Sequence, residues 1–176
     1  PESGLPPYEV EGKHVAVLGG GDTAMDCLRT ALRAGAKSVV CLYRRDEANM
    51  PGSHKEYDNA IEAGAGFEFL TNPIALVGND ENQVTEVRCI RMELGKPDAS
   101  GRRRPIPVAD SEFGVPADLV LVAFGFDLEK FPEGSDLEGL KLNEWGTVVV
   151  NKNQMTNLPG VFSGGDRERF KPLLDD

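Results

Sequence analysis

The fold is decided by one stretch, His14-Val15-Ala16-Val17-Leu18-Gly19-Gly20-Gly21-Asp22-Thr23-Ala24. Residues 14–18 are a short apolar run typical of a buried strand, and a helical pattern of apolar residues follows the glycines over 23–34. Gly35 stands where a left-handed residue commonly ends such a helix. Residues 38–43 are nearly all apolar or β-branched, as in a parallel strand covered on both faces. A β-α-β unit is therefore expected to close within about thirty residues.

The glycines between this strand and helix match the G-x-G-x-x-A pattern of dinucleotide-binding domains. Gly19 would permit the tight turn, Gly21 would let a diphosphate approach the backbone, and Ala24 would let helix and strand pack closely. The start of the helix would then offer unpaired N–H groups and a positive dipole end to the phosphates. The alternative is a tight glycine turn that binds nothing.

Two polar residues follow the glycines. We expect Asp22 and Thr23 to cap the helix, with Thr23 and Asp26 forming a capping box in which Asp replaces the usual Glu. On this interpretation the carboxylate of Asp22 serves the helix and does not oppose a bound phosphate.

The end of the second strand bears on which dinucleotide would bind. Domains that bind NAD usually carry an acidic residue there, which accepts a hydrogen bond from the ribose 2′-hydroxyl. Here the chain reads Tyr43-Arg44-Arg45. Guanidinium groups bind phosphate through paired, charge-assisted hydrogen bonds, whereas an acid would repel a 2′-phosphate. The sequence therefore predicts a preference for NADP over NAD that depends on Arg44 and Arg45, unless one of them is merely exposed at the strand end.

The rest of the chain predicts further elements of both kinds. A helix is expected at 53–63, ended by Gly64 and Gly66, and strands or short extended pieces are expected at 67–70, 84–94, 106–108, 117–124 and 147–150, with a final short run at 160–162. Apolar and charged residues mix over 84–94, which indicates an antiparallel meander instead of another β-α-β unit. Residues 96–104 form the expected hairpin loop, and Arg102, Arg103 and Arg104 are interpreted as solvated loop charges. The predicted fold class is α/β, a Rossmann-like three-layer domain with a central parallel sheet and an antiparallel meander.

Composition narrows the class of protein. With 176 residues, of which 40% are apolar and 27% charged, the chain has the make-up of one globular domain. Asp and Glu outnumber Lys and Arg by 29 to 19, and the formal net charge of −10 argues against a nucleic-acid partner. No signal peptide or membrane-spanning run is recognised, so we expect no membrane contact and a cytoplasmic location.

Cysteine and histidine spacing excludes other chemistries. Cys27, Cys41 and Cys89 lie far apart, form no CxxC pair and share no metal-ligand spacing with His14 or His54. Buried structural thiols are expected, with no metal site and no catalytic acid, base or nucleophile. The absence of CxxC also argues against a thioredoxin-reductase-like active site, and that of Tyr-x-x-x-Lys against a short-chain dehydrogenase.

Taken together, these motifs resemble the NADPH-binding domain of the glutamate synthase small subunit, in the FAD/NAD(P)-dependent pyridine nucleotide oxidoreductase family. The likeness is carried by VAVLGGGDTAMDC (15–27), RTALRAGAKSVVCLYRRDEANMPGS (29–53), MELGKPDASGRR (92–103), ADLVLVAFGF (117–126) and TNLPGVFSGGD (156–166). The same domain in another NADPH-linked flavoprotein, such as dihydropyrimidine dehydrogenase, and a non-catalytic NADP(H)-sensing module are the alternatives.

The resemblance implies a parent enzyme in which NADPH gives hydride to FAD, and electrons leave through iron–sulfur clusters to a large subunit that makes glutamate. Residues 1–12 are rich in Pro and Gly and are interpreted as a linker. The resemblance divides the rest of the chain into an NADP(H)-binding domain (13–150) and a remnant of a discontinuous FAD-binding domain (151–176). FAD is expected only in the full-length parent, and the isolated fragment is expected to be inactive. The cofactor-binding residues expected from motif and resemblance are Gly19, Gly20, Gly21, Asp22, Thr23, Ala24, Arg44, Arg45, Gly125 and Asp166.

Overall fold

The structure is a computed structural model that describes residues 9–98, 101–125, 133–143 and 146–164. Its contacts divide the chain into two compact units, residues 1–125 and 126–176. This division by compactness falls earlier than residue 150, where the sequence places the end of the cofactor-binding domain. The functional boundary itself stays a prediction.

The first unit is built on a parallel sheet of four strands. These are β1 (His14–Leu18), β2 (Ser38–Leu42), β3 (Gly66–Glu68) and β7 (Leu119–Val122), in the order β3-β2-β1-β7. β1 pairs in parallel with both β2 and β7, so the chain builds first to one side of β1 and later to the other. In such sheets the point where the strand order reverses opens a crevice at the carboxyl ends of the strands.

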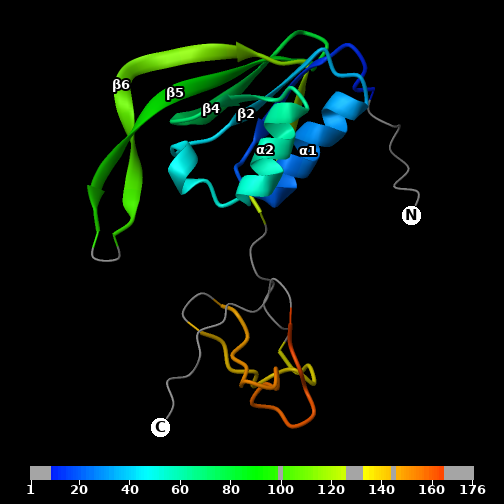
Figure 1. The fold of residues 1–176 in the computed structure, drawn as a ribbon, viewed down its shortest axis with the longest axis vertical. Coiled ribbons are helices and arrows are strands. Elements are labelled where there is room, and N and C mark those ends of the chain that lie inside the picture. The colour runs from blue at the N-terminus through cyan, green and yellow to red at the C-terminus, as the bar shows by residue number, and fades with distance from the viewer. Residues whose placement is uncertain (1–8, 99–100, 126–132, 144–145, 165–176) are drawn as a thin grey trace. The chain divides into compact units, whose positions relative to one another are not determined.

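Two helices cover one face of this sheet (Figure 1). They are α1 (Asp22–Arg33) and α2 (His54–Glu62). Successive strand residues point to opposite faces, so Val15 and Val17 join the core beneath the helices, together with Met25 and Leu28 of α1. Gly35 adopts a φ of 84°, as expected of the left-handed residue that ends α1.

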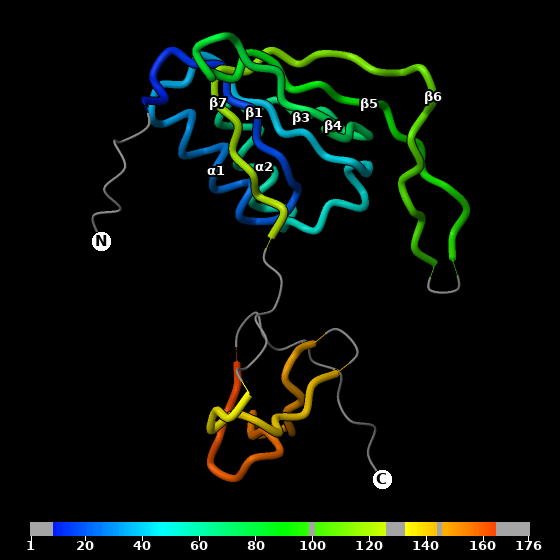
Figure 2. The backbone as a smooth tube through the Cα atoms, turned by 180° about the vertical axis from the view of Figure 1, so that it is seen from behind, coloured from blue at the N-terminus to red at the C-terminus, as the bar shows by residue number. Residues whose placement is uncertain are grey.

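A three-stranded antiparallel sheet covers the other face. It consists of β4 (Thr71–Gly78), β5 (Val84–Pro97) and β6 (Arg103–Pro116), in that order. Ala16 and Leu18 of β1 pack here against Val87 and Cys89 of β5. Helices, parallel sheet and meander thus form the three predicted layers, and Figure 2 shows them from behind. The meander was predicted too short, because the expected strands at 84–94 and 106–108 belong to two strands of 14 residues each.

The second unit contains only isolated β-bridges within its described residues. Leu142 pairs with Val148 and Met155 with Phe162, both antiparallel. The strand predicted at 147–150 was therefore wrong as a strand, because it meets its partner at a single position instead of along a ladder.

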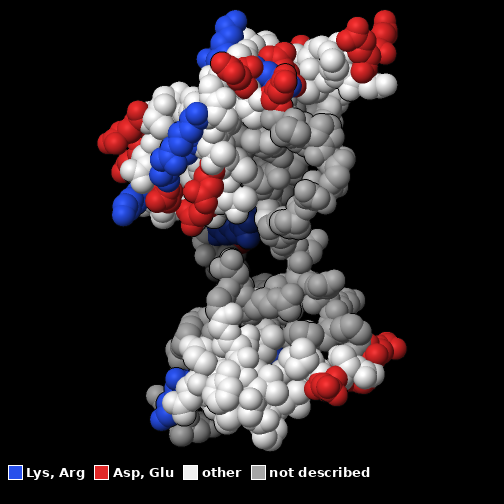
Figure 3. Space-filling view, turned by 90° about the vertical axis from the view of Figure 1, so that its right-hand side faces the viewer, with Lys and Arg blue, Asp and Glu red and all other residues white. Residues whose placement is uncertain are grey.

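Figure 3 shows basic and acidic side chains interspersed over the described part of one face of the molecule. Among the described residues no helix is both long and apolar enough to cross a membrane.

Candidate functional site

A cavity of about 440 Å³ opens at the carboxyl ends of β1, β2 and β7. It lies within the first unit and at the reversal of strand order between β1 and β7. Its lining comprises Gly19, Gly20, Gly21, Thr23, Leu42, Tyr43, Arg44, Arg45, Asn49, Pro51, Asn72, Pro73, Arg102, Ala123, Phe124 and Gly125. The structure thus gathers at one cavity seven of the ten site residues expected from the sequence.

The three glycines of the turn serve different purposes. Gly19 has a φ of 139°, and a Cβ there would lie 2.2 Å from the Ala123 carbonyl oxygen. A Cβ on Gly20 would lie 2.7 Å from the Tyr43 ring. A Cβ on Gly21 would meet nothing within 4 Å, although Gly21 lines the cavity. The first two glycines are thus required by the fold, whereas the third keeps space open beside the backbone.

The start of α1 presents free donors to this cavity. Ala24 N–H and Met25 N–H both donate to the Gly21 carbonyl, at 2.9 and 3.2 Å. Within the described part of the chain, the N–H groups of residues 20–23 donate to no protein acceptor. A helix start with unpaired N–H groups is a binding site for anions.

The predicted capping arrangement was wrong. The N-cap residue is Gly21, in extended conformation, and it makes no side-chain cap hydrogen bond. The helix begins at Asp22, one residue earlier than expected, so the side chains of Asp22 and Thr23 lie within the first turn instead of before it. Asp22 Oδ1 instead accepts a hydrogen bond of 2.8 Å from Ser53 N–H. Ala24, the last residue of the motif, is fully buried between helix and sheet, which agrees with its expected packing role.

A segment that sequence reasoning missed holds the glycine turn from outside. Gly52 N–H donates to the Gly20 carbonyl at 2.9 Å, next to the bond from Ser53 to Asp22. A Cβ on Gly52 would lie 3.0 Å from that same carbonyl oxygen, so a larger residue would push the segment away. Ser53 also caps α2, accepting from Glu56 N–H at 3.3 Å. The S-x-x-E spacing could have marked the start of α2, but it carries no signal of contact with the turn.

The two arginines after β2 differ in their surroundings. Arg45 is half-buried and donates to the Asn49 side-chain oxygen at 2.5 Å. Asn49 ends a short 3₁₀ helix, η1 (Glu47–Asn49), and its carbonyl accepts from the Tyr43 hydroxyl at 2.9 Å. Arg44 is exposed, and among the described residues its guanidinium has no hydrogen-bond or ion-pair partner. Both line the cavity, Arg45 in a fixed position and Arg44 with all its donors free.

Arg102 is exposed at the end of the hairpin, as expected of a solvated loop charge, but it also lines the cavity. Breaks in the pairing of β5 with β6 lie between Ile90 and Met92 and between Leu94 and Pro97. The hairpin bends beyond the sheet, on the side of the segment that follows β2 (Figures 1 and 2).

Neighbouring Arg103, in contrast, is not a free loop charge, which corrects its interpretation as a solvated one. Its guanidinium donates to the Leu94 and Gly95 carbonyls at 2.7 and 2.9 Å. These two bonds tie the strands together at the end of the hairpin. Arg104 is exposed and is absent from the lining of the cavity.

Cys41 and Cys89 are buried, as expected, whereas Cys27 is only half-buried. Cys41 Sγ donates to the Gly19 carbonyl at 3.0 Å beneath the turn, and burial raises the pKa of this thiol to about 12. Burial likewise raises the pKa of Cys89 to about 11. All three cysteines are free, and the described residues contain no cluster suited to hold a metal ion.

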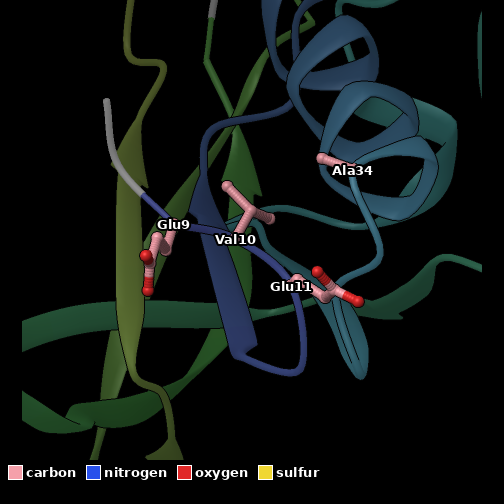
Figure 4. A pocket seen from close by; sticks show the side chains of 4 residues that line it. All are labelled: Glu9, Val10, Glu11 and Ala34. Atoms are coloured by element: carbon pink, nitrogen blue, oxygen red, sulfur yellow. The ribbon is translucent and has the colours of Figure 1, made fainter. Parts of the chain in front are cut away.

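A second hollow, of about 520 Å³, lies elsewhere on the first unit. It is lined by Glu9, Val10, Glu11 and Ala34, before β1 and at the end of α1 (Figure 4). Two of these four side chains are acidic, so this hollow is not suited to phosphate.

Asp166, the last predicted site residue, lies outside the described residues. Gly125 does line the first cavity, with a φ of 90°.

The layers, the glycine turn and the cavity at the strand reversal define a domain of the FAD/NAD(P)-binding fold. The chain belongs to the pyridine nucleotide-disulphide oxidoreductase family, which its residues 2–173 match. A solved thioredoxin reductase of T. acidophilum has the same fold, with a TM-score of 0.65 at 22% identity, over 92% of this chain and 46% of that one.

Closer relatives in sequence are longer proteins. The chain is 52% identical over 168 residues to the putative oxidoreductase AegA of Escherichia coli (strain K12), covering 93% of this chain and 25% of AegA. It is also 52% identical over 164 residues to the glutamate synthase [NADPH] small chain of Azospirillum brasilense, covering 93% of this chain and 34% of that protein. The chain therefore spans a quarter to a third of the length of these relatives.

Proposed function

We propose that the first unit binds NADP(H), with the diphosphate at the start of α1 and the 2′-phosphate between Arg44 and Arg45. The observation that carries the proposal is the cavity itself, which places the glycine turn and both guanidinium groups around one space. The residues suit the cofactor on two counts. Gly21 leaves an open cradle that a side chain would fill, and the neighbouring N–H groups have no protein acceptor in the described part of the chain.

We propose further that the whole protein is an NADPH-dependent oxidoreductase of the glutamate synthase small-chain type. Bound NADPH would supply a hydride to FAD, and electrons would pass through iron–sulfur clusters to a large subunit in the cytoplasm. The identity to the Azospirillum small chain supports this assignment. The equal identity to AegA supports oxidoreductase chemistry without favouring glutamate synthesis.

In this proposal the residues of the first unit bind and orient the nicotinamide nucleotide and transfer no proton. Holding a reactive group in the correct place accounts for much of the acceleration that enzymes achieve. Gly125 is assigned to the edge of the cavity toward the flavin, and Asp166 to the flavin itself. FAD is proposed to bind only in the full-length protein.

Calorimetric titration of the 176-residue chain with NADPH, NADH and FAD, each separately, tests the proposal. NADPH should bind at least about tenfold more tightly than NADH, a difference of ~1.4 kcal/mol, and FAD should give no binding heat. Equal affinity for the two nicotinamide nucleotides would remove the role given to the arginines. Binding of neither would remove the proposal altogether.

A further inference from the structure

Arg102 stands at the end of a hairpin but faces the same cavity as the two arginines after β2. It follows the turn that joins β5 to β6, far in sequence from Arg44 and Arg45. Tyr43 lies among the three guanidinium groups: burial raises the pKa of its phenol, and the charges of all three arginines act in the opposite direction. The cavity thus has cations contributed by two separate parts of the chain.

The backbone of Arg102 is held in place. Asp98 N–H donates to the Arg102 carbonyl at 3.0 Å, and Arg102 N–H donates to Asp98 Oδ1 at 3.1 Å. Arg103 closes the same end of the hairpin through its bonds to the Leu94 and Gly95 carbonyls. The guanidinium of Arg102 itself is exposed and pairs with no described residue. A fixed backbone with a free charge is the arrangement expected of a ligand-binding side chain, since little backbone order is lost on binding.

The charge of the cavity is uncompensated. Three of its lining residues are arginines, and no described lining residue is Asp or Glu. This contrasts with the formal net charge of −10 of the whole chain. Like charges around one space repel each other, and a dianionic phosphate placed among them would relieve that repulsion.

We propose that Arg102 is a third cation for the 2′-phosphate and therefore helps to select NADPH over NADH. This rests on the proposed function, because it adds a residue to the same nucleotide site. The hairpin of the meander would thereby contribute to cofactor choice, a property usually assigned to the end of the second strand. Arg103 is a positioning residue, which acts by holding the hairpin end that carries Arg102.

The test compares Arg102→Ala with the matched control Arg104→Ala, which removes the same charge from the same hairpin outside the cavity. Calorimetric titrations of the 176-residue chain with NADPH and with NADH supply the readout. Arg102→Ala should weaken NADPH binding about fivefold, the size of one exposed ion pair, and leave NADH binding unchanged. Arg104→Ala should change neither. NADPH affinity should also fall less steeply with added salt in Arg102→Ala than in the unaltered chain, because fewer charges meet the ligand.

Each outcome decides a separate point. Equal weakening of NADPH and NADH by Arg102→Ala would place the residue on a part common to both and overturn the proposal. No effect, or the same effect from Arg104→Ala, would overturn it as well. If Arg44→Ala lowers the preference for NADPH while Arg102→Ala leaves it unchanged, the proposed function stands and this inference fails. If the unaltered chain binds no NADPH, both fail.

Discussion

Replacing Gly21 by alanine should separate cofactor binding from stability. Gly21 has a φ of −88° and a ψ of 178°, which any residue adopts, and a Cβ would meet nothing within 4 Å. Alanine should stabilise the fold by ~0.4–1 kcal/mol, because it restricts the unfolded chain more than glycine does. It should destabilise the fold by a similar amount, because alanine is a poorer N-cap residue than glycine. The free energy of unfolding should therefore change by less than about 0.5 kcal/mol, whereas the methyl group would occupy the space proposed for the diphosphate.

Two assays on the Gly21→Ala variant check this reasoning. Urea unfolding followed by far-ultraviolet circular dichroism gives its stability, and calorimetry with NADPH gives its affinity. We expect an unchanged unfolding midpoint and an NADPH affinity lowered at least about tenfold, or ~1.4 kcal/mol. A folded variant that binds NADPH as tightly as the unaltered chain would refute the assignment of the diphosphate to this turn. A large loss of stability would refute the account of the open space at Gly21.

Three further predictions concern neighbouring residues. Gly19→Ala should lower the free energy of unfolding by ~3 kcal/mol or more, measured by urea unfolding, because strain at positive φ adds to a Cβ only 2.2 Å from a carbonyl oxygen; a neutral effect would contradict the geometry. Arg44→Ala should lower the ratio of NADPH to NADH affinity without loss of stability. Arg45→Ala should lower that ratio and also lower the free energy of unfolding by ~1 kcal/mol, because its bond to Asn49 is lost. Equal stability of the two variants would contradict this difference. Cys41 should resist alkylation in the native protein at about pH 8, being buried and neutral. Its contribution to stability should decline as pH rises from the ordinary thiol pKa of 9.0 toward the folded value of about 12, because the fold favours the neutral thiol; a Cys41→Ala variant with the same alkaline decline would contradict this.

Local signals explain why so much of the first unit was predictable. The strand at 14–18 was predicted with the bounds that the structure gives β1, because a short apolar run before a glycine turn has few other structures available. Gly35 was placed correctly as a left-handed residue, since the helical pattern stops just before it. The layered class followed from the change from β-α-β to meander patterning, and both core clusters confirm it.

Contacts between distant segments explain what the sequence missed. Nothing in the run 51–53 indicates that Gly52 and Ser53 donate across to the glycine turn and to Asp22, because both donors are backbone N–H groups that any residue except proline provides. The capping role predicted for Asp22 was wrong because the helix starts one residue earlier than expected. Local sequence patterns determine such helix boundaries poorly. The place of Arg102 depends on how a long hairpin bends, which is set by register shifts and not by composition.

A crystal structure of the chain with NADP⁺ tests the central claim most directly. The account predicts the diphosphate within hydrogen-bond distance of the N–H groups at the start of α1, and the 2′-phosphate beside Arg44 and Arg45. A nucleotide bound elsewhere on the chain, or bound here with its 2′-phosphate directed away from both arginines, would contradict it.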